Sequence, residues 1–146
     1  MWKLTGLAVM AVLQLGLSSG SAVETLTLSG NPLSLMVSTA LAGLQPDAVL
    51  DQATTYDVSV TQTSQIAVQL TSSLPSGLTL RVRMDAPAGA VSAGYVSLTT
   101  TAQDLVTSIP SGSYSELTVS YEISGTVSAS VVALNTVDVD FTLTAQ

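Results

Sequence analysis

The sequence predicts an all-β protein: a single Ig-like antiparallel β-sandwich that follows a cleaved signal peptide. Beyond the first two dozen residues, apolar and polar residues alternate along most of the chain, which is typical of half-buried strands. Serine and threonine are abundant, at 21 and 19 residues, and threonine favours strands. Glycine- and proline-rich turn signals separate the alternating runs, as they do in sandwiches.

The first 22 residues have the three parts of a secretory signal peptide. Residues 1–3 carry a positive charge, residues 4–17 are an uncharged and mostly apolar run, and residues 18–22 are small. We expect cleavage after residue 22, which leaves one β-sandwich domain of residues 23–146. The apolar run is too short to cross a bilayer comfortably, and no second hydrophobic segment follows. We therefore expect a protein without a membrane span, secreted to the extracellular space or the cell surface, by way of the periplasm if the host has an outer membrane.

Nine alternating runs are predicted as strands, and turn signals such as S-G-N-P and P-S-G separate them. They are Glu24–Leu28, Leu33–Val37, Tyr56–Thr61, Gln65–Thr71, Leu78–Met84, Tyr95–Thr100, Leu117–Ile123, Thr126–Val131 and Val137–Thr144.

Two segments also fit a helix. Asn31 followed by Pro32 resembles a capped helix start, and Gly43 would end that helix. The strand interpretation takes only residues 33–37 of this segment and is favoured by the β context. A short helix at Ala102–Val106 is the second alternative.

Two runs stand out as core strands, because each places four large apolar groups on one face. Burying each such side chain contributes about 1.5–3 kcal/mol. The two sets are Leu117, Val119, Tyr121 and Ile123, and Val137, Val139, Phe141 and Leu143.

The composition argues against most catalytic and nucleic-acid functions. The chain has no histidine and no cysteine, which removes catalytic triads, cysteine nucleophiles and nearly every zinc site. Its net charge is −7, and Arg81 and Arg83 are the only cationic side chains beyond the predicted signal peptide, so we expect no nucleic-acid binding. We expect neither an enzyme nor a cofactor.

Asp138 and Asp140 lie two apart on a predicted strand and so share a face. One interpretation is a calcium site, completed by further oxygen ligands. The favoured one is a solvated outer face, or a charged edge that discourages unwanted strand pairing. The favoured interpretation predicts no metal site.

Arg81 and Arg83 also share a face, and we expect outward cross-strand pairing with two carboxylates. Binding of an acidic ligand is the alternative, because the arginine fork suits carboxylates. The tyrosines are either a sugar-binding platform or, as favoured, core and strand-end residues. They are Tyr56, Tyr95, Tyr114 and Tyr121.

The stretch S-G-S-Y-S-E-L-T-V-S-Y-E-I, residues 111–123, resembles the start of a strand in spore coat U-type domains and in archaic chaperone–usher pilins. The matching positions of this glycine-x-tyrosine-x-acid turn are Gly112, Tyr114 and Glu116. The glycine permits the turn, and the tyrosine packs where the strand begins. Those families often carry cysteine, which this chain lacks, and their motif usually leads into the last strand.

The pilin-like resemblance implies a subunit that assembles by strand donation, in which an extended segment of one copy completes a sheet of the next. The segment V-E-T-L-T-L-S-G is the candidate donor strand, with Val23, Leu26 and Leu28 as its apolar residues. The alternative is that this segment is the first strand of its own domain.

We therefore expect a secreted structural protein, a subunit of an extracellular filament, pilus or surface coat. Its partners would be further copies of itself or other surface proteins. The alternative is a monomeric secreted binding module or adhesin that recognises a glycan or a surface protein.

Overall fold

The computed structural model describes residues 7–15, 24–30, 35, 45–126 and 135–146, and every regular element in this part of the chain is a strand. The all-β prediction is therefore confirmed. The strands are β1 (Leu7–Leu15), β2 (Thr25–Ser29), β3 (Val49–Val60), β4 (Ser64–Leu70), β5 (Leu78–Met84), β6 (Val91–Ser92), β7 (Val96–Ser97), β8 (Gln103–Ile109), β9 (Gly112–Gly125) and β10 (Asn135–Ala145).

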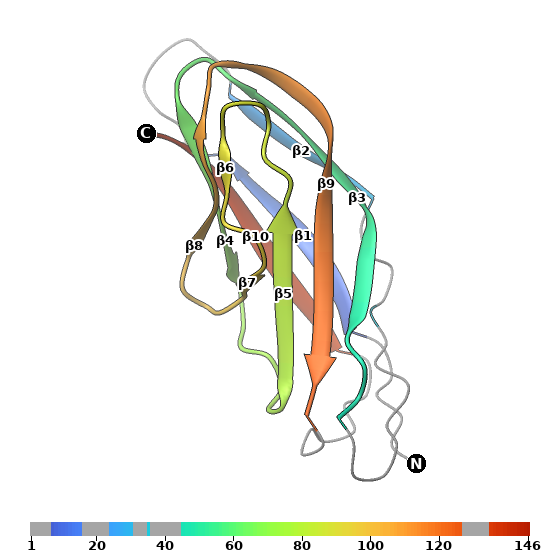
Figure 1. The fold of residues 1–146 in the computed structure, drawn as a ribbon. Helices are drawn as coiled ribbons and strands as arrows, with labels where there is room; N and C mark the ends of the chain where they lie inside the picture. The colour runs from blue at the N-terminus through green and yellow to red at the C-terminus, as the bar shows by residue number, and fades with distance from the viewer. Residues whose placement is uncertain (1–6, 16–23, 31–34, 36–44, 127–134) are drawn as a thin grey trace.

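The strands form two five-stranded sheets. The order is β1-β10-β4-β8-β6 in the first sheet and β2-β3-β9-β5-β7 in the second. Figure 1 shows the long strands β5 and β9 of the second sheet in front of β1 and β10 of the first. Every neighbouring pair is antiparallel except β1 and β10, which are parallel. The fold is thus sandwich-like, and its one parallel pair lies at a sheet edge.

The core lies between the sheets, because strands of both sheets bury alternate residues over much of their length. The burial patterns of β4 and β5 alternate without interruption over seven residues each. The two predicted core strands, β9 and β10, belong to different sheets, and both contribute large apolar groups to the core. Their fully buried members are Val119, Tyr121, Val139 and Phe141, each 0 % exposed.

The predicted strands at 24–28, 65–71, 78–84 and 137–144 agree with β2, β4, β5 and β10 to within two residues at each end. The predicted strand at 95–100 shrinks to β7, because only two of its residues pair with β5. By contrast, β3 and β9 are longer than predicted. The helix alternative at 31–44 and the predicted strands at 33–37 and 126–131 lie outside the described residues, apart from Leu35, which is 2 % exposed, and Thr126.

The alternative of a helix at Ala102–Val106 is wrong, because these residues lead into and lie in β8. The strand was missed because its alternation breaks: Leu105 and Val106 are adjacent and both 0 % exposed. The β4–β8 register shifts there: Val106 pairs with Ile66 and Asp104 pairs with Ala67, so Leu105 is an extra residue in β8. Such a bulge puts two consecutive side chains in the core, which imitates a helical spacing.

Candidate strand-pairing edge

The β1–β10 pair joins the predicted signal peptide to the last strand of the first sheet. The two strands run parallel over nine residues, from Leu7 paired with Asn135 to Leu15 paired with Leu143. On its other side, β10 is antiparallel to β4. Without β1, the outer row of β10 backbone N–H and C=O groups would have no strand partner among the described strands.

One face of β10 is made of large apolar residues, although the strand would lie at a sheet edge without β1. Val137, Val139, Phe141 and Leu143 are all at most 2 % exposed. A long apolar edge strand favours pairing with another strand, which satisfies its backbone groups and shields its core face. The outer edge of β10 is therefore a site where an added strand gains both hydrogen bonds and apolar contact.

The two aspartates of β10 differ in their surroundings. Asp138 is partly exposed. Its backbone carbonyl accepts two hydrogen bonds from Thr71, one from the backbone N–H at 3.1 Å and one from the side-chain hydroxyl at 3.4 Å. Asp140 is only 7 % exposed, and its Oδ1 is buried without a hydrogen-bond partner in the described part of the chain. The prediction of a solvated outer face is therefore wrong for Asp140.

Calcium binding gains no support at this position. Among the described residues, no three histidine, cysteine, aspartate or glutamate side chains come together as a metal site would require. Asp47 and Asp51, the other closely spaced aspartates, show no such grouping there either. The unpartnered oxygen of Asp140 therefore calls for a hydrogen-bond donor rather than for a recognisable cation cage.

The candidate donor segment lies in the second sheet. There β2 is an edge strand that pairs antiparallel with β3, from Thr25 opposite Ser59 to Ser29 opposite Thr55. Leu26 is 0 % exposed and Leu28 is partly buried; Val23 lies outside the described residues. The alternative of a first strand in its own domain thus matches this arrangement, and donation would require β2 to leave β3.

The glycine-x-tyrosine-x-acid motif opens β9. A Cβ on Gly112, whose φ is +153°, would lie 3.1 Å from the Tyr114 hydroxyl oxygen and 3.2 Å from the adjoining ring carbon. The Tyr114 hydroxyl donates a hydrogen bond to the Pro110 carbonyl at 3.2 Å. The glycine therefore makes room for a tyrosine ring that folds back over the start of its own strand.

The third residue of the motif marks a bulge. Glu116 has φ +57°, a left-handed conformation that is uncommon for a non-glycine residue. The β3–β9 register shifts here, so that two β9 residues stand against one residue of β3, Asp57. The Glu116 backbone N–H donates to Asp57 Oδ1 at 2.7 Å. Asp57 is therefore a structural partner of the motif. It was not predicted from the sequence, because it lies 59 residues away from Glu116 along the chain.

The predicted cross-strand ion pairing of the two arginines is found for one of them. Arg81 lies directly opposite Glu122 on β9 and forms the expected cross-strand ion pair, with Nε 2.9 Å from Oε1. Arg83 instead pairs with Asp85 on its own chain segment, at 2.9 Å, because its cross-strand neighbour is Ser120. Cross-strand pairing was therefore correct for the first arginine and wrong for the second.

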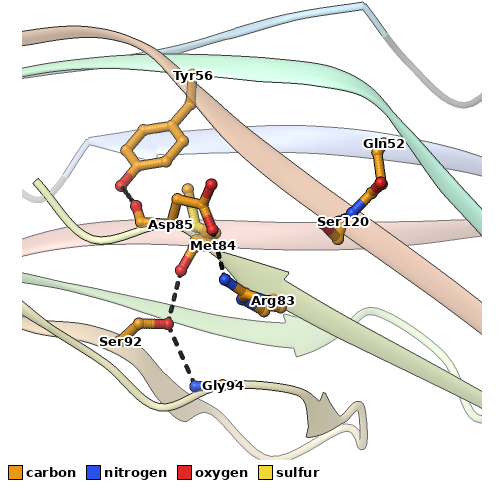
Figure 2. A network of polar contacts seen from close by, with 8 residues as sticks. All are labelled: Gln52, Tyr56, Arg83, Met84, Asp85, Ser92, Gly94 and Ser120. Atoms are coloured by element: carbon orange, nitrogen blue, oxygen red, sulfur yellow. Dashed lines mark hydrogen bonds and ion pairs between the residues drawn. The ribbon is translucent and has the colours of Figure 1, made fainter.

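Figure 2 shows how the end of β5 is held. The Tyr56 hydroxyl donates to the Asp85 carbonyl, and the Ser92 hydroxyl donates to the Met84 carbonyl at 2.7 Å. The Gly94 N–H in turn donates to the Ser92 hydroxyl at 3.2 Å. These bonds connect β3, β5 and the β6–β7 loop around an aspartate that also holds an arginine.

The tyrosines do not form one platform. Tyr56 and Tyr121 are 0 % exposed in the core, and burial, reinforced by Asp85 and Asp51 respectively, raises the pKa of each well above its usual range. The Tyr121 hydroxyl has no hydrogen-bond partner in the described part of the chain. Tyr114 lies at a strand start, as described above. The favoured interpretation of core and strand-end residues therefore agrees with these three.

Tyr95 is the exception, because it lies beside a charge. The Arg81 guanidinium carbon is 5.4 Å from the centre of its ring, within range of a cation–π interaction. Both side chains are partly exposed on the β5–β7 side of the second sheet.

Two hollows accompany these features. One, of about 200 Å³, lies over the start of β9 and is lined by Thr25, Asp57, Ser59, Ser113 and Tyr114 among others. The other, of about 450 Å³, opens between the sheets near the β4–β5 loop, with leucine walls and a serine and threonine rim. Both are shallow, and the charged residue among their linings is Asp57 in the first hollow.

The chain matches neither a model of a known protein family nor a curated protein. The pilin-like resemblance of residues 111–123 therefore stays a prediction. In the described residues, no helix is long and apolar enough to cross a membrane.

Proposed function

We propose that this chain is a secreted structural protein, an Ig-like subunit of an extracellular filament, pilus or surface coat that assembles by strand donation. The observation that carries the proposal is the outer edge of β10, which pairs over nine residues with a strand from the predicted signal peptide. Cleavage after residue 22 would remove that strand and leave β10 as a long edge strand with one apolar face. An edge of this kind is a template for a strand of another copy.

The composition agrees with a structural role. The absence of histidine and cysteine disfavours catalysis, and a chain of low charge, rich in serine and threonine, suits a packed polymer of sheets. The glycine-x-tyrosine-x-acid motif at the start of β9 adds the pilin-like resemblance.

Fibre formation tests the proposal. The chain from Val23 to Gln146 is expressed beside a shorter one that lacks residues 23–30, and both are viewed by negative stain. We expect fibres only from the longer chain, because only it carries the candidate donor. Monomers of equal stability from both chains would contradict strand donation.

A monomeric glycan-binding module or adhesin is the second candidate. The packing of Arg81 against Tyr95 favours it, because a tyrosine ring offers an apolar surface with a polar tip and an arginine fork suits the carboxylate of a sugar acid. A glycan array with the wild type and with Arg81→Met tests it. Binding that is lost in the variant supports this function, and an array without hits counts against it.

A further inference from the structure

The outer edge of β10 has a chemical requirement that its present neighbour does not meet. Asp140 lies in the middle of the strand, is 7 % exposed and has an Oδ1 without a hydrogen-bond partner among the described residues. Its Cα pairs with Val12 of β1 on one side and with Gln69 of β4 on the other. Valine has no side-chain hydrogen-bond donor, so the sequence of β1 offers nothing to this oxygen at the paired position.

A better-matched strand can be described from β10 itself. Residues paired with Val139 and Phe141, both 0 % exposed, should be apolar, because those positions face the core. The residue between them, paired with Asp140, should carry a short side-chain donor such as a hydroxyl. A buried carboxylate oxygen that gains a donor is stabilised, whereas one left alone is costly.

The strand β2 has this pattern. It reads T-L-T-L-S, with Leu26 and Leu28 on either side of Thr27. In its own sheet, Leu26 is 0 % exposed while Thr25 and Thr27 are exposed, so the strand already presents one apolar and one hydroxyl face. Because the pattern is symmetric about Thr27, it fits β10 whether the added strand runs parallel or antiparallel.

We infer that the resident partner of the β10 edge is the Thr25–Ser29 strand of a second copy, in the register that places Thr27 beside Asp140. The Thr27 hydroxyl then donates to Asp140 Oδ1, and this bond selects the register over neighbouring ones. The inference rests on the proposed strand donation and adds its register. The segment Leu7–Leu15 then occupies the edge only until cleavage, and its residue opposite Asp140, Val12, is less favourable there than a threonine.

The exchange conserves backbone pairing. In its own copy, β2 is an edge strand with a single neighbour, and five of its residues pair with β3. If β2 were transferred to β10 of another copy, the same five residues would again pair with one neighbouring strand. What differs is the side-chain contact, because Thr27 is exposed in its own sheet and would meet a buried acceptor in the other.

A peptide-binding experiment tests the register independently of polymerisation. The full chain carries a site-specific protease sequence in place of residues 18–22, and it is cut after purification. A fluorescein-labelled peptide of residues 24–30 is titrated with cut and uncut chain, with anisotropy as the readout. The variant peptide has Thr27→Val, which keeps the shape of the side chain, and the control peptide has Thr25→Val.

We expect the wild-type peptide to bind the cut chain and not the uncut chain. Thr27→Val should weaken binding about tenfold or more, the scale of a hydrogen bond to a charged group. The control peptide should stay within about threefold of the wild type. With an Asp140→Val chain, whose fold is checked by urea unfolding, the two variant peptides should bind with equal affinity.

The remaining outcomes separate the inference from the proposed function. Equal affinities for both variant peptides, or no binding of the wild-type peptide, would overturn the inference. If fibres still form from the cut chain, strand donation itself survives that result. Binding that depends on Thr27 without any fibres would support the register and contradict the filament.

Discussion

The two buried tyrosines give the sharpest test of the described core, because the same substitution should destabilise the fold at one position and not at the other. Tyr56 and Tyr121 are both 0 % exposed. The Tyr56 hydroxyl donates to the Asp85 carbonyl, whereas the Tyr121 hydroxyl is buried without a partner in the described part of the chain. Replacement by phenylalanine removes one oxygen in each case and leaves the ring in place.

The expected magnitudes follow from these contacts. Tyr56→Phe loses a hydrogen bond with a net contribution of about 0.5–1.5 kcal/mol, and it also deprives a partly buried carbonyl of its donor. We expect a loss of about 1–2 kcal/mol in the free energy of unfolding. Tyr121→Phe removes an unsatisfied polar group whose burial costs about 1–3 kcal/mol. We expect this variant to be as stable as the wild type or up to about 2 kcal/mol more stable.

Urea unfolding of the full chain, followed by circular dichroism, measures both values. The slope of the transition should be equal in the three proteins, so that the midpoints compare stability directly. If Tyr121→Phe loses as much stability as Tyr56→Phe, the Tyr121 hydroxyl has a partner and the described core is wrong at that point.

Three further results are expected. Raising the pH above about 10 should destabilise the chain, because burial raises the pKa of Tyr56 and Tyr121 and only the unfolded chain releases their protons there; phenolate absorbance that develops for all tyrosines before unfolding would contradict this. Glu116→Gly should stabilise the fold by about 0.5–1 kcal/mol in urea unfolding, since glycine adopts a φ of +57° without strain; a loss of stability would mean that the side chain has an unseen role. Glu122→Gln should cost less than about 1 kcal/mol, because the Arg81 side chain is 40 % exposed, and the cost should shrink in 1 M salt; a larger cost that ignores salt would count against a screened surface pair.

The sequence predicted the strands in which one face is buried without interruption. In β5 and β10, every second residue from Leu78 to Met84 and from Val137 to Leu143 is buried, so the pattern and the structure coincide. The first half of β3, from Val49 to Ala53, was not predicted, because the sequence V-L-D-Q-A does not alternate apolar and polar residues.

The candidate edge was only partly predictable. The apolar face of β10 and the two-faced pattern of β2 are visible in the sequence. That Asp140 is buried is not visible, because its exposure depends on neighbours rather than on its own strand. The β1–β10 pairing was also not predictable, since the apolar run at residues 4–17 carries no sign of the strand with which part of it pairs.

Among the described strands, two non-glycine residues have a left-handed backbone: Ser108, with φ +55°, and Glu116, with φ +57°. The amide of each donates to a side chain that is far away in the sequence. Glu116 donates to Asp57, and the Ser108 N–H donates to Gln146 Oε1 at 3.1 Å. The register shifts at these points of β8 and β9 are therefore stabilised partly by residues outside those two strands. A substitution at position 57 or 146 would reach the backbone of another strand, and we expect such positions to tolerate change only in concert with their partners.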